Sequence, residues 1–80
     1  MDTRTGILNV MSTLGIDTTN ITDETRLKED LEMDSTEYIE LAVAIERQLS
    51  VPVEDKPFMA LKTFGAVVNY IDECKLAVSA

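Results

Sequence analysis

The chain has 80 residues, 45% of them hydrophobic, and a net charge of −8. This length allows one domain, 1–80, at the small end of what folds alone. The acidic balance argues against nucleic-acid binding, which needs Lys and Arg at the phosphates, and it favours partners with basic surfaces. No apolar run approaches the roughly 20 residues of a membrane span, and the first residues lack the apolar core of a signal peptide.

Cys74 is the only cysteine, and histidine is absent. A single cysteine cannot form an intramolecular disulfide and fits a reducing cytoplasm, and nothing nearby suggests that it is an activated nucleophile. The lack of His removes the commonest general base and all His-bearing metal sites. With two Phe, two Tyr and no Trp, we expect an aliphatic core of modest stability, weakened further by repulsion among the acids.

Residues 3–14 predict the first helix, because apolar side chains recur there at the spacing of one helical face. Gly15 is well placed as the left-handed residue that ends this helix. The buried stripe of the predicted helix consists of Ile7, Val10, Met11 and Leu14.

Residues 16–34 form a long connection rich in Asp, Thr and Asn, which favour turns and caps. A loop of this length is uncommon in a compact domain unless it is anchored or functional, and 25–31 predicts one helical turn. Several acids cluster here, but the connection lacks the central Gly of an EF-hand, so we expect no dedicated metal site. Loose binding of divalent cations, which would relieve repulsion among the acids, stays open. The expected anchors are Ile16, Ile21, Leu27, Leu31 and Met33.

Residues 35–49 predict the best helix of the chain. Asp34 is expected to be its N-cap and Glu37 the acid of a capping box. Ser35 then falls in the first turn, where the helix dipole favours a phosphate esterified to the hydroxyl. The apolar face consists of Tyr38, Leu41, Ala42, Ile45 and Leu49.

Pro52 biases the preceding residue away from helical geometry and so ends this helix. Residues 55–61 predict a short helix, preceded by Asp55 or Lys56, with Pro57 in its first turn.

The last helix is expected to begin at Thr63 as N-cap and to fray from Lys75. The chain therefore predicts an all-α fold, a four-helix bundle with three longer helices and a short third helix. The apolar face of the last helix consists of Phe64, Val67, Val68 and Ile71.

The helix that opens on Asp34-Ser35 resembles the second helix of acyl carrier proteins. The resemblance runs without gaps over residues 27–71, and flanking segments of suitable length and pattern extend it to essentially the whole chain. It implies that Ser35 carries a 4′-phosphopantetheine arm, whose thiol holds acyl groups as thioesters, and that the chain is a non-catalytic carrier.

The resemblance also implies two surfaces. One is a partner-facing strip, an apolar line edged by acids, and the other is a cargo cleft between the second and third helices. The strip would consist of Thr36, Glu37, Ile39, Glu40 and Val43. The cleft would be lined by Ile45, Val53, Phe58, Met59 and Leu61.

The expected partners are a phosphopantetheinyl transferase, an acyltransferase or acyl/aminoacyl ligase, and a ketosynthase or condensing enzyme, each with a basic docking surface. Three positions depart from the family pattern: Thr36 replaces a leucine, Arg47 replaces an acid, and Tyr38 is unusually bulky. These departures favour polyketide or mixed peptide–polyketide (antibiotic) biosynthesis over fatty-acid synthesis. An aminoacyl or peptidyl cargo stays open, although the Gly-Gly-x-Ser pattern of peptidyl carriers is absent.

Two alternatives belong to other classes of function. One is an unmodified helical adaptor that binds partners through the helix over 35–49. The other is a serine hydrolase using Asp34 and Ser35, which the lack of His disfavours. With no linker at either end, we expect a freestanding monomer.

Overall fold

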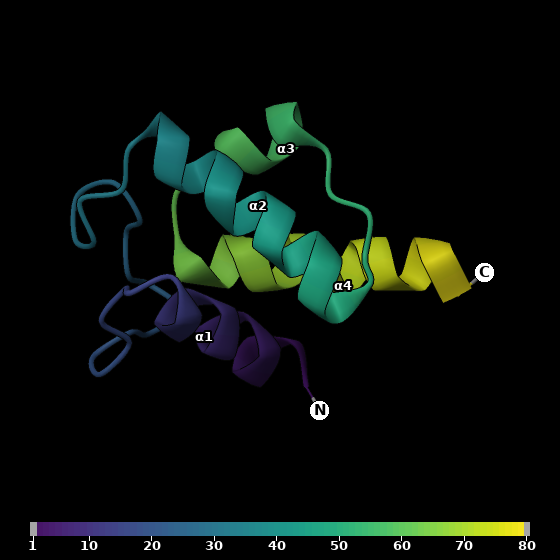
Figure 1. Cartoon of the computed structure of the whole chain (residues 1–80), viewed down its shortest axis with the longest axis horizontal. Coiled ribbons are helices and arrows are strands. Elements are labelled where there is room, and N and C mark those ends of the chain that lie inside the picture. The colour runs from purple at the N-terminus through teal and green to yellow at the C-terminus, as the bar shows by residue number, and fades with distance from the viewer. Residues whose placement is uncertain (1, 80) are drawn as a thin grey trace.

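The computed structural model describes residues 2–79, with side chains for residues 2–76. Four helices make up the described fold, and no strand occurs among these residues (Figure 1). Helix α2 contacts both α1 and α3, which lie on opposite sides of it in Figure 1, and α1 also contacts α4. The predicted all-α four-helix fold is confirmed. The helices are α1 (Thr3–Thr13), α2 (Ser35–Leu49), α3 (Asp55–Met59) and α4 (Phe64–Ser79).

Local capping chemistry sets most of the helix ends, as the sequence predicts. At the end of α1, Gly15 adopts a left-handed φ of 87°, a conformation that causes no steric strain in a residue without a Cβ. Asp34 caps α2 through a complete capping box. Thr63 caps α4, because its Oγ1 accepts a hydrogen bond from the Ala66 amide at 3.2 Å.

Three predictions about helix ends are wrong. Leu14 is the C-cap of α1 and is 38% exposed, because the helix ends at Thr13 and Leu14 no longer follows the buried face formed by Ile7, Val10 and Met11. Helix α3 is preceded by Glu54 instead of Asp55 or Lys56. The last helix does not fray at Lys75, whose ammonium donates a hydrogen bond to Thr3 Oγ1 at 2.9 Å.

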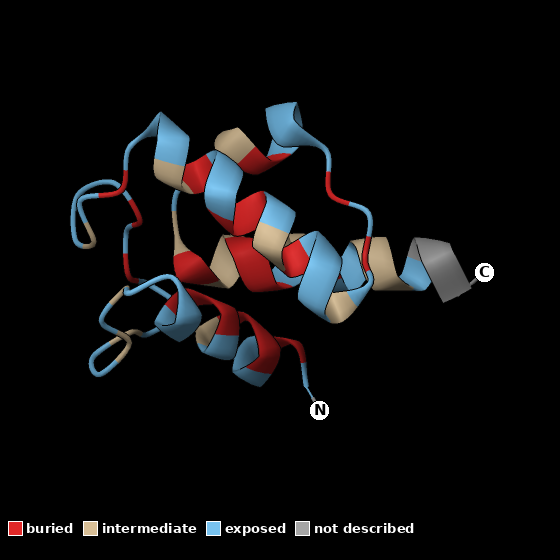
Figure 2. Ribbon diagram, viewed as in Figure 1, coloured by how far each residue is buried: buried red, intermediate tan, exposed pale blue. Residues whose placement is uncertain are grey.

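The core lies between the helices and takes in parts of the connections, as the red ribbon segments in Figure 2 show. It is not simply aliphatic: Tyr38, Phe58 and Phe64 are its largest fully buried side chains. The rings of Tyr38 and Phe58 meet edge to face, with centroids 6.0 Å apart. The aliphatic core residues are Ile7, Val10, Met11, Leu27, Met33, Leu41, Ala42, Ile45, Val51, Val53, Val67, Val68 and Ile71.

The long connection is anchored both by side chains and by backbone hydrogen bonds to the start of α4. Leu27 and Met33 are buried, whereas the other three predicted anchors are half-buried. The Leu27 amide donates to the Lys62 carbonyl at 2.9 Å, and the Phe64 amide donates to the Thr25 carbonyl at 2.9 Å. These bonds flank an isolated antiparallel bridge between residues 26 and 63, so the loop is held against the α3–α4 connection.

No described helix has the length and apolar character needed to cross a membrane.

Candidate functional site

Ser35 is the first residue of α2 and is exposed. The neighbouring acids are occupied by the capping box: Asp34 Oδ1 accepts from the Glu37 amide at 2.9 Å, and Glu37 Oε1 accepts from the Asp34 amide at 3.4 Å. Within the described part of the chain, the Ser35 hydroxyl has no hydrogen-bond partner. The local structure therefore holds an unbonded hydroxyl at the surface on a capped helical turn.

The electrostatics of this turn suit a phosphodiester on Ser35. The amides of Ser35 and Thr36 belong to the first turn of α2, where no carbonyl of the same helix can accept from them. These amides and the aligned peptide dipoles place partial positive charge beside the hydroxyl. A phosphopantetheine arm esterified there would meet donors on one side and open solvent on the other.

A comparison with known families adds to this geometry. The family model described as a phosphopantetheine attachment site matches residues 9–71, which include Ser35. The chain belongs to this family. Its prosthetic group is 4′-phosphopantetheine, and the acyl carrier resemblance seen in the sequence is confirmed at the level of the family. Carrier domains of this kind work together with modifying and biosynthetic enzymes.

The predicted partner strip of this carrier lies on the outer side of α2. Ile39 and Val43 are 43% and 46% exposed and lie together on the wall of one groove. Thr36 and Glu40 are exposed as well, whereas Glu37 is half-buried and engaged in the capping box.

The exposed surface around the predicted strip extends beyond the residues predicted from the sequence. A shallow groove of about 540 Å³ joins the strip to the end of α1 through Leu14, the residue misassigned to the core. Arg47 lines the far end of the same groove. The groove therefore combines residues of α2 with the C-cap of α1 and carries charges of both signs.

The predicted cargo cleft needs correction. Ile45 and Phe58 are fully buried and Val53 is 7% exposed, so these three side chains belong to the core and do not line the cavity found beside α2. Their apolar pattern indicated burial but could not distinguish a core from a cavity wall. The other two cleft residues, Met59 and Leu61, do line that cavity, which measures about 510 Å³.

Tyr38 forms the inner wall of this cavity, which we call the α2–α3 pocket. Its hydroxyl donates to the Leu61 carbonyl at 2.9 Å, and burial raises the pKa of the phenol above its ordinary value. The ammonium nitrogen of Lys28 lies 5.8 Å from the centre of the Tyr38 ring. Sequence reasoning missed Lys28 and its neighbour Lys62, because no local pattern links them to Tyr38.

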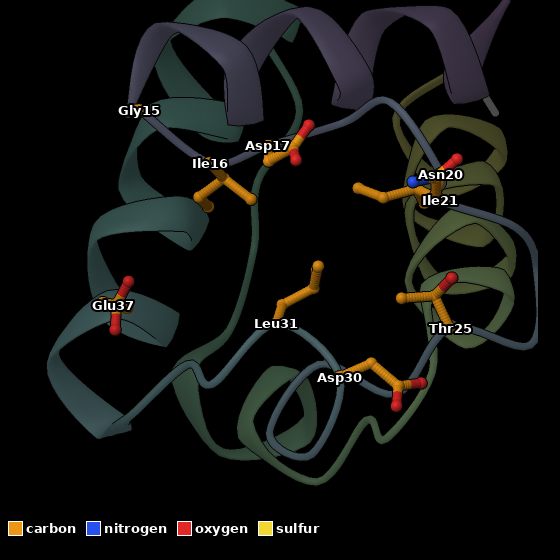
Figure 3. A pocket seen from close by; sticks show the side chains of 9 residues that line it. All are labelled: Gly15, Ile16, Asp17, Asn20, Ile21, Thr25, Asp30, Leu31 and Glu37. Carbon is orange, nitrogen blue, oxygen red and sulfur yellow. The ribbon is translucent and has the colours of Figure 1, made fainter.

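A second cavity, of about 470 Å³, lies under the long connection (Figure 3). Ile21 and Leu31 point into it, and several carboxylates stand at its edge. Two of these carboxylates already form hydrogen bonds within the loop. Asp17 accepts from the Thr19 amide at 2.9 Å, and Asp30 accepts from the Arg26 amide at 2.8 Å.

The hydrogen bonds from the Thr19 and Arg26 amides lower the pKa of Asp17 and of Asp30 respectively. No group of three His, Cys, Asp or Glu residues within the described chain is arranged to hold a metal ion.

Proposed function

We propose that Ser35 carries the phosphopantetheine arm and that the chain presents acyl groups to the enzymes of a polyketide or mixed peptide–polyketide pathway. The observation that carries the proposal is an exposed hydroxyl without a partner on a capped first turn, in a chain of the phosphopantetheine attachment family. When bound, the arm supplies the thiol that holds the acyl group as a thioester.

Loading of the arm balances without any further reactant. The Ser35 oxygen attacks the phosphorus of coenzyme A that bears the pantetheine group, forming the Oγ–P bond. The bond from that phosphorus to the adenosine bisphosphate breaks, and the serine proton passes to a base of the transferase. In this chain, the residues beside Ser35 hold the hydroxyl at the start of the capped helix.

The loading test is incubation with coenzyme A and a broad-specificity phosphopantetheinyl transferase, followed by intact-mass measurement. The wild-type chain should gain one phosphopantetheine, and Ser35→Ala should gain none. Ser12→Ala, which alters an exposed serine on α1, is the matched control and should load like wild type. A wild-type chain that stays unmodified, while a known carrier loads in the same tube, would favour the unmodified adaptor instead.

Partner enzymes would dock on the strip of α2, where Glu40 supplies the charge and Ile39 and Val43 the apolar contact. Glu40→Lys should slow association with a basic transferase at low salt, and the difference should shrink as salt screens the charges. Glu73→Lys makes the same charge change at an exposed position of α4 and should have a much smaller effect. Equal loading rates for the two variants would show that docking occurs elsewhere.

The choice of pathway is supported by Thr36, Tyr38 and Arg47, which set this chain apart from the usual pattern of acyl carriers. A monomer working in the cytoplasm fits the single cysteine. Intact mass of the protein purified from its native host tests the pathway, because the mass added to the arm reports the cargo. A polyketide-type acyl group is expected. A long fatty acyl group would instead assign the chain to fatty-acid synthesis, and an amino acid would assign it to an aminoacyl or peptidyl pathway.

A further inference from the structure

Positive charge is concentrated at the α2–α3 pocket of an otherwise acidic protein. The chain has only seven Lys and Arg residues and a net charge of −8, yet Arg26, Lys28 and Lys62 all line this one cavity. Glu29 is the only acid among the lining residues. Docking to basic partner enzymes would favour acidic residues, so it does not account for three cations around one cavity.

Two of these three cations carry charge that no acid of the described chain neutralises. The Arg26 guanidinium pairs with Glu29 and, at 3.2 Å, with Asp30. Neither Lys28 nor Lys62 forms an ion pair with any described residue, although the Lys28 ammonium lies over the Tyr38 ring. The uncompensated charge around the cavity is therefore positive.

Hydrogen bonds hold together the backbone segments that carry these lysines. The hydrogen bond from the Leu27 amide to the Lys62 carbonyl joins the two segments that carry them. The bond from Tyr38 to the Leu61 carbonyl ties the same connection to α2. Tyr38, Met59 and Leu61 provide the apolar part of the cavity lining that Lys28 and Lys62 share, and the Lys28 ammonium lies over the Tyr38 ring. The Tyr38 hydroxyl already donates to the Leu61 carbonyl and has no free proton to offer.

The pocket lies close to the attachment point. Tyr38 follows Ser35 by three residues in α2, which corresponds to a rise of about 4.5 Å along the helix axis. A flexible arm longer than one helical turn, fixed at Ser35, can fold back over Tyr38 and place its cargo in this cavity.

We propose that the α2–α3 pocket selects an acyl cargo that bears its own terminal carboxylate, an inference that rests on the proposed attachment of the arm at Ser35. Methylene groups of the cargo pack on Tyr38, Met59 and Leu61, and the carboxylate lies between Lys28 and Lys62. The two ammonium groups are exposed, so the attraction is moderate and sensitive to salt.

The experiment compares three loaded forms of the whole chain: the arm alone, the arm with glutaryl, and the arm with an uncharged isostere in which an isopropyl group replaces the glutaryl carboxylate. Each is made by transfer from the corresponding coenzyme A derivative and checked by intact mass. At low salt, glutaryl should raise the melting temperature by about 4 °C over the arm alone, and the isostere should give less than half of that rise. About 1 M salt, with a Debye length of about 3 Å, should remove most of the difference.

Variants and amide NMR shifts identify the groups responsible. In the double variant Lys28→Gln/Lys62→Gln the glutaryl form should melt no higher than the isostere form, whereas Lys56→Gln, the same change on an exposed α3 residue, should keep the difference. Glutaryl should also move the amide signals of residues 28, 38 and 62 more than the isostere does.

Three results would overturn the proposal. If glutaryl and the isostere raise the melting temperature equally, the pocket does not distinguish a charged cargo from an uncharged one. The same changes in the form with the arm alone would assign the lysines to the phosphate of the arm. A glutaryl effect that persists in the double variant would place the carboxylate elsewhere. In each case the mass gain on Ser35 still reports separately whether the proposed attachment is correct.

Discussion

The hydrogen bond between Asp34 and the first turn of α2 can be isolated by two substitutions at one position. Asp34→Ala removes both the carboxylate charge and the oxygen that accepts from the Glu37 amide at 2.9 Å. Asp34→Asn removes the same charge but keeps a side-chain oxygen in the capping position. Because the chain carries a net charge of −8, the loss of one acid relieves some repulsion in both variants, and this relief cancels in their difference.

The expected difference follows from the geometry of the capping box. Loss of an N-cap acceptor costs about 1 kcal/mol, and the reciprocal bond from the Asp34 amide to Glu37, at 3.4 Å, is too long to add much. In a domain of 80 residues, a loss of about 1 kcal/mol lowers the melting temperature by roughly 5 °C. Asp34→Ala should therefore melt roughly 5 °C below Asp34→Asn.

The measurement is thermal unfolding followed by far-UV circular dichroism, with all variants in one buffer. Glu24→Ala removes an exposed acid whose side chain makes no described contact, and it should change the melting temperature little. If Asp34→Ala and Asp34→Asn melt together, the Asp34 cap does not stabilise the first turn of α2 that carries Ser35.

Three further predictions concern the rest of the molecule. Tyr38→Phe removes the bond to the Leu61 carbonyl and should cost about 1 kcal/mol in chemical denaturation. Burial raises the pKa of Tyr38 above 10.0, so the folded chain keeps a phenol proton that the unfolded chain releases. The free energy of unfolding should therefore fall above pH 10, and it should fall less steeply in Tyr38→Phe. Gly65→Ala should lower the free energy of unfolding by about 1–3 kcal/mol, because the new Cβ would lie 2.9 Å from the Asp23 carbonyl oxygen. An unchanged free energy of unfolding would show that the loop at Asp23 moves aside without cost. Sodium chloride should raise the melting temperature by screening the net charge of −8, and equal values in dilute and concentrated salt would contradict this.

Features determined by neighbouring residues were predictable from the sequence. The start of α2 follows from Asp34 and Glu37, whose spacing places each side chain beside the backbone amide that it satisfies. Gly15 and Thr63 mark helix ends by equally local chemistry. The fold class and the exposed position of Ser35 follow from these caps together with the helical spacing of the apolar residues.

Features that depend on distant contacts were not predictable. Leu14 continues the apolar spacing of α1, but the spacing does not reveal that the helix has already ended and that no neighbour covers the side chain. Phe58 looks equally suitable for a core and for a cleft wall until the fold places Tyr38 against it. Lys28 and Lys62 are far apart in the sequence, and only the bridge beside them brings both to one cavity.

The central claim is that one particular oxygen carries the arm, and peptide mapping of the protein from its native host tests it most directly. Trypsin cleaves after Lys28 and after Arg47, and the resulting peptide contains a single serine, Ser35, next to Thr36. Fragmentation of that peptide should place a phosphopantetheine, with or without cargo, on Ser35. The arm on Thr36 or on any other peptide, or its complete absence from the native protein, would contradict the account.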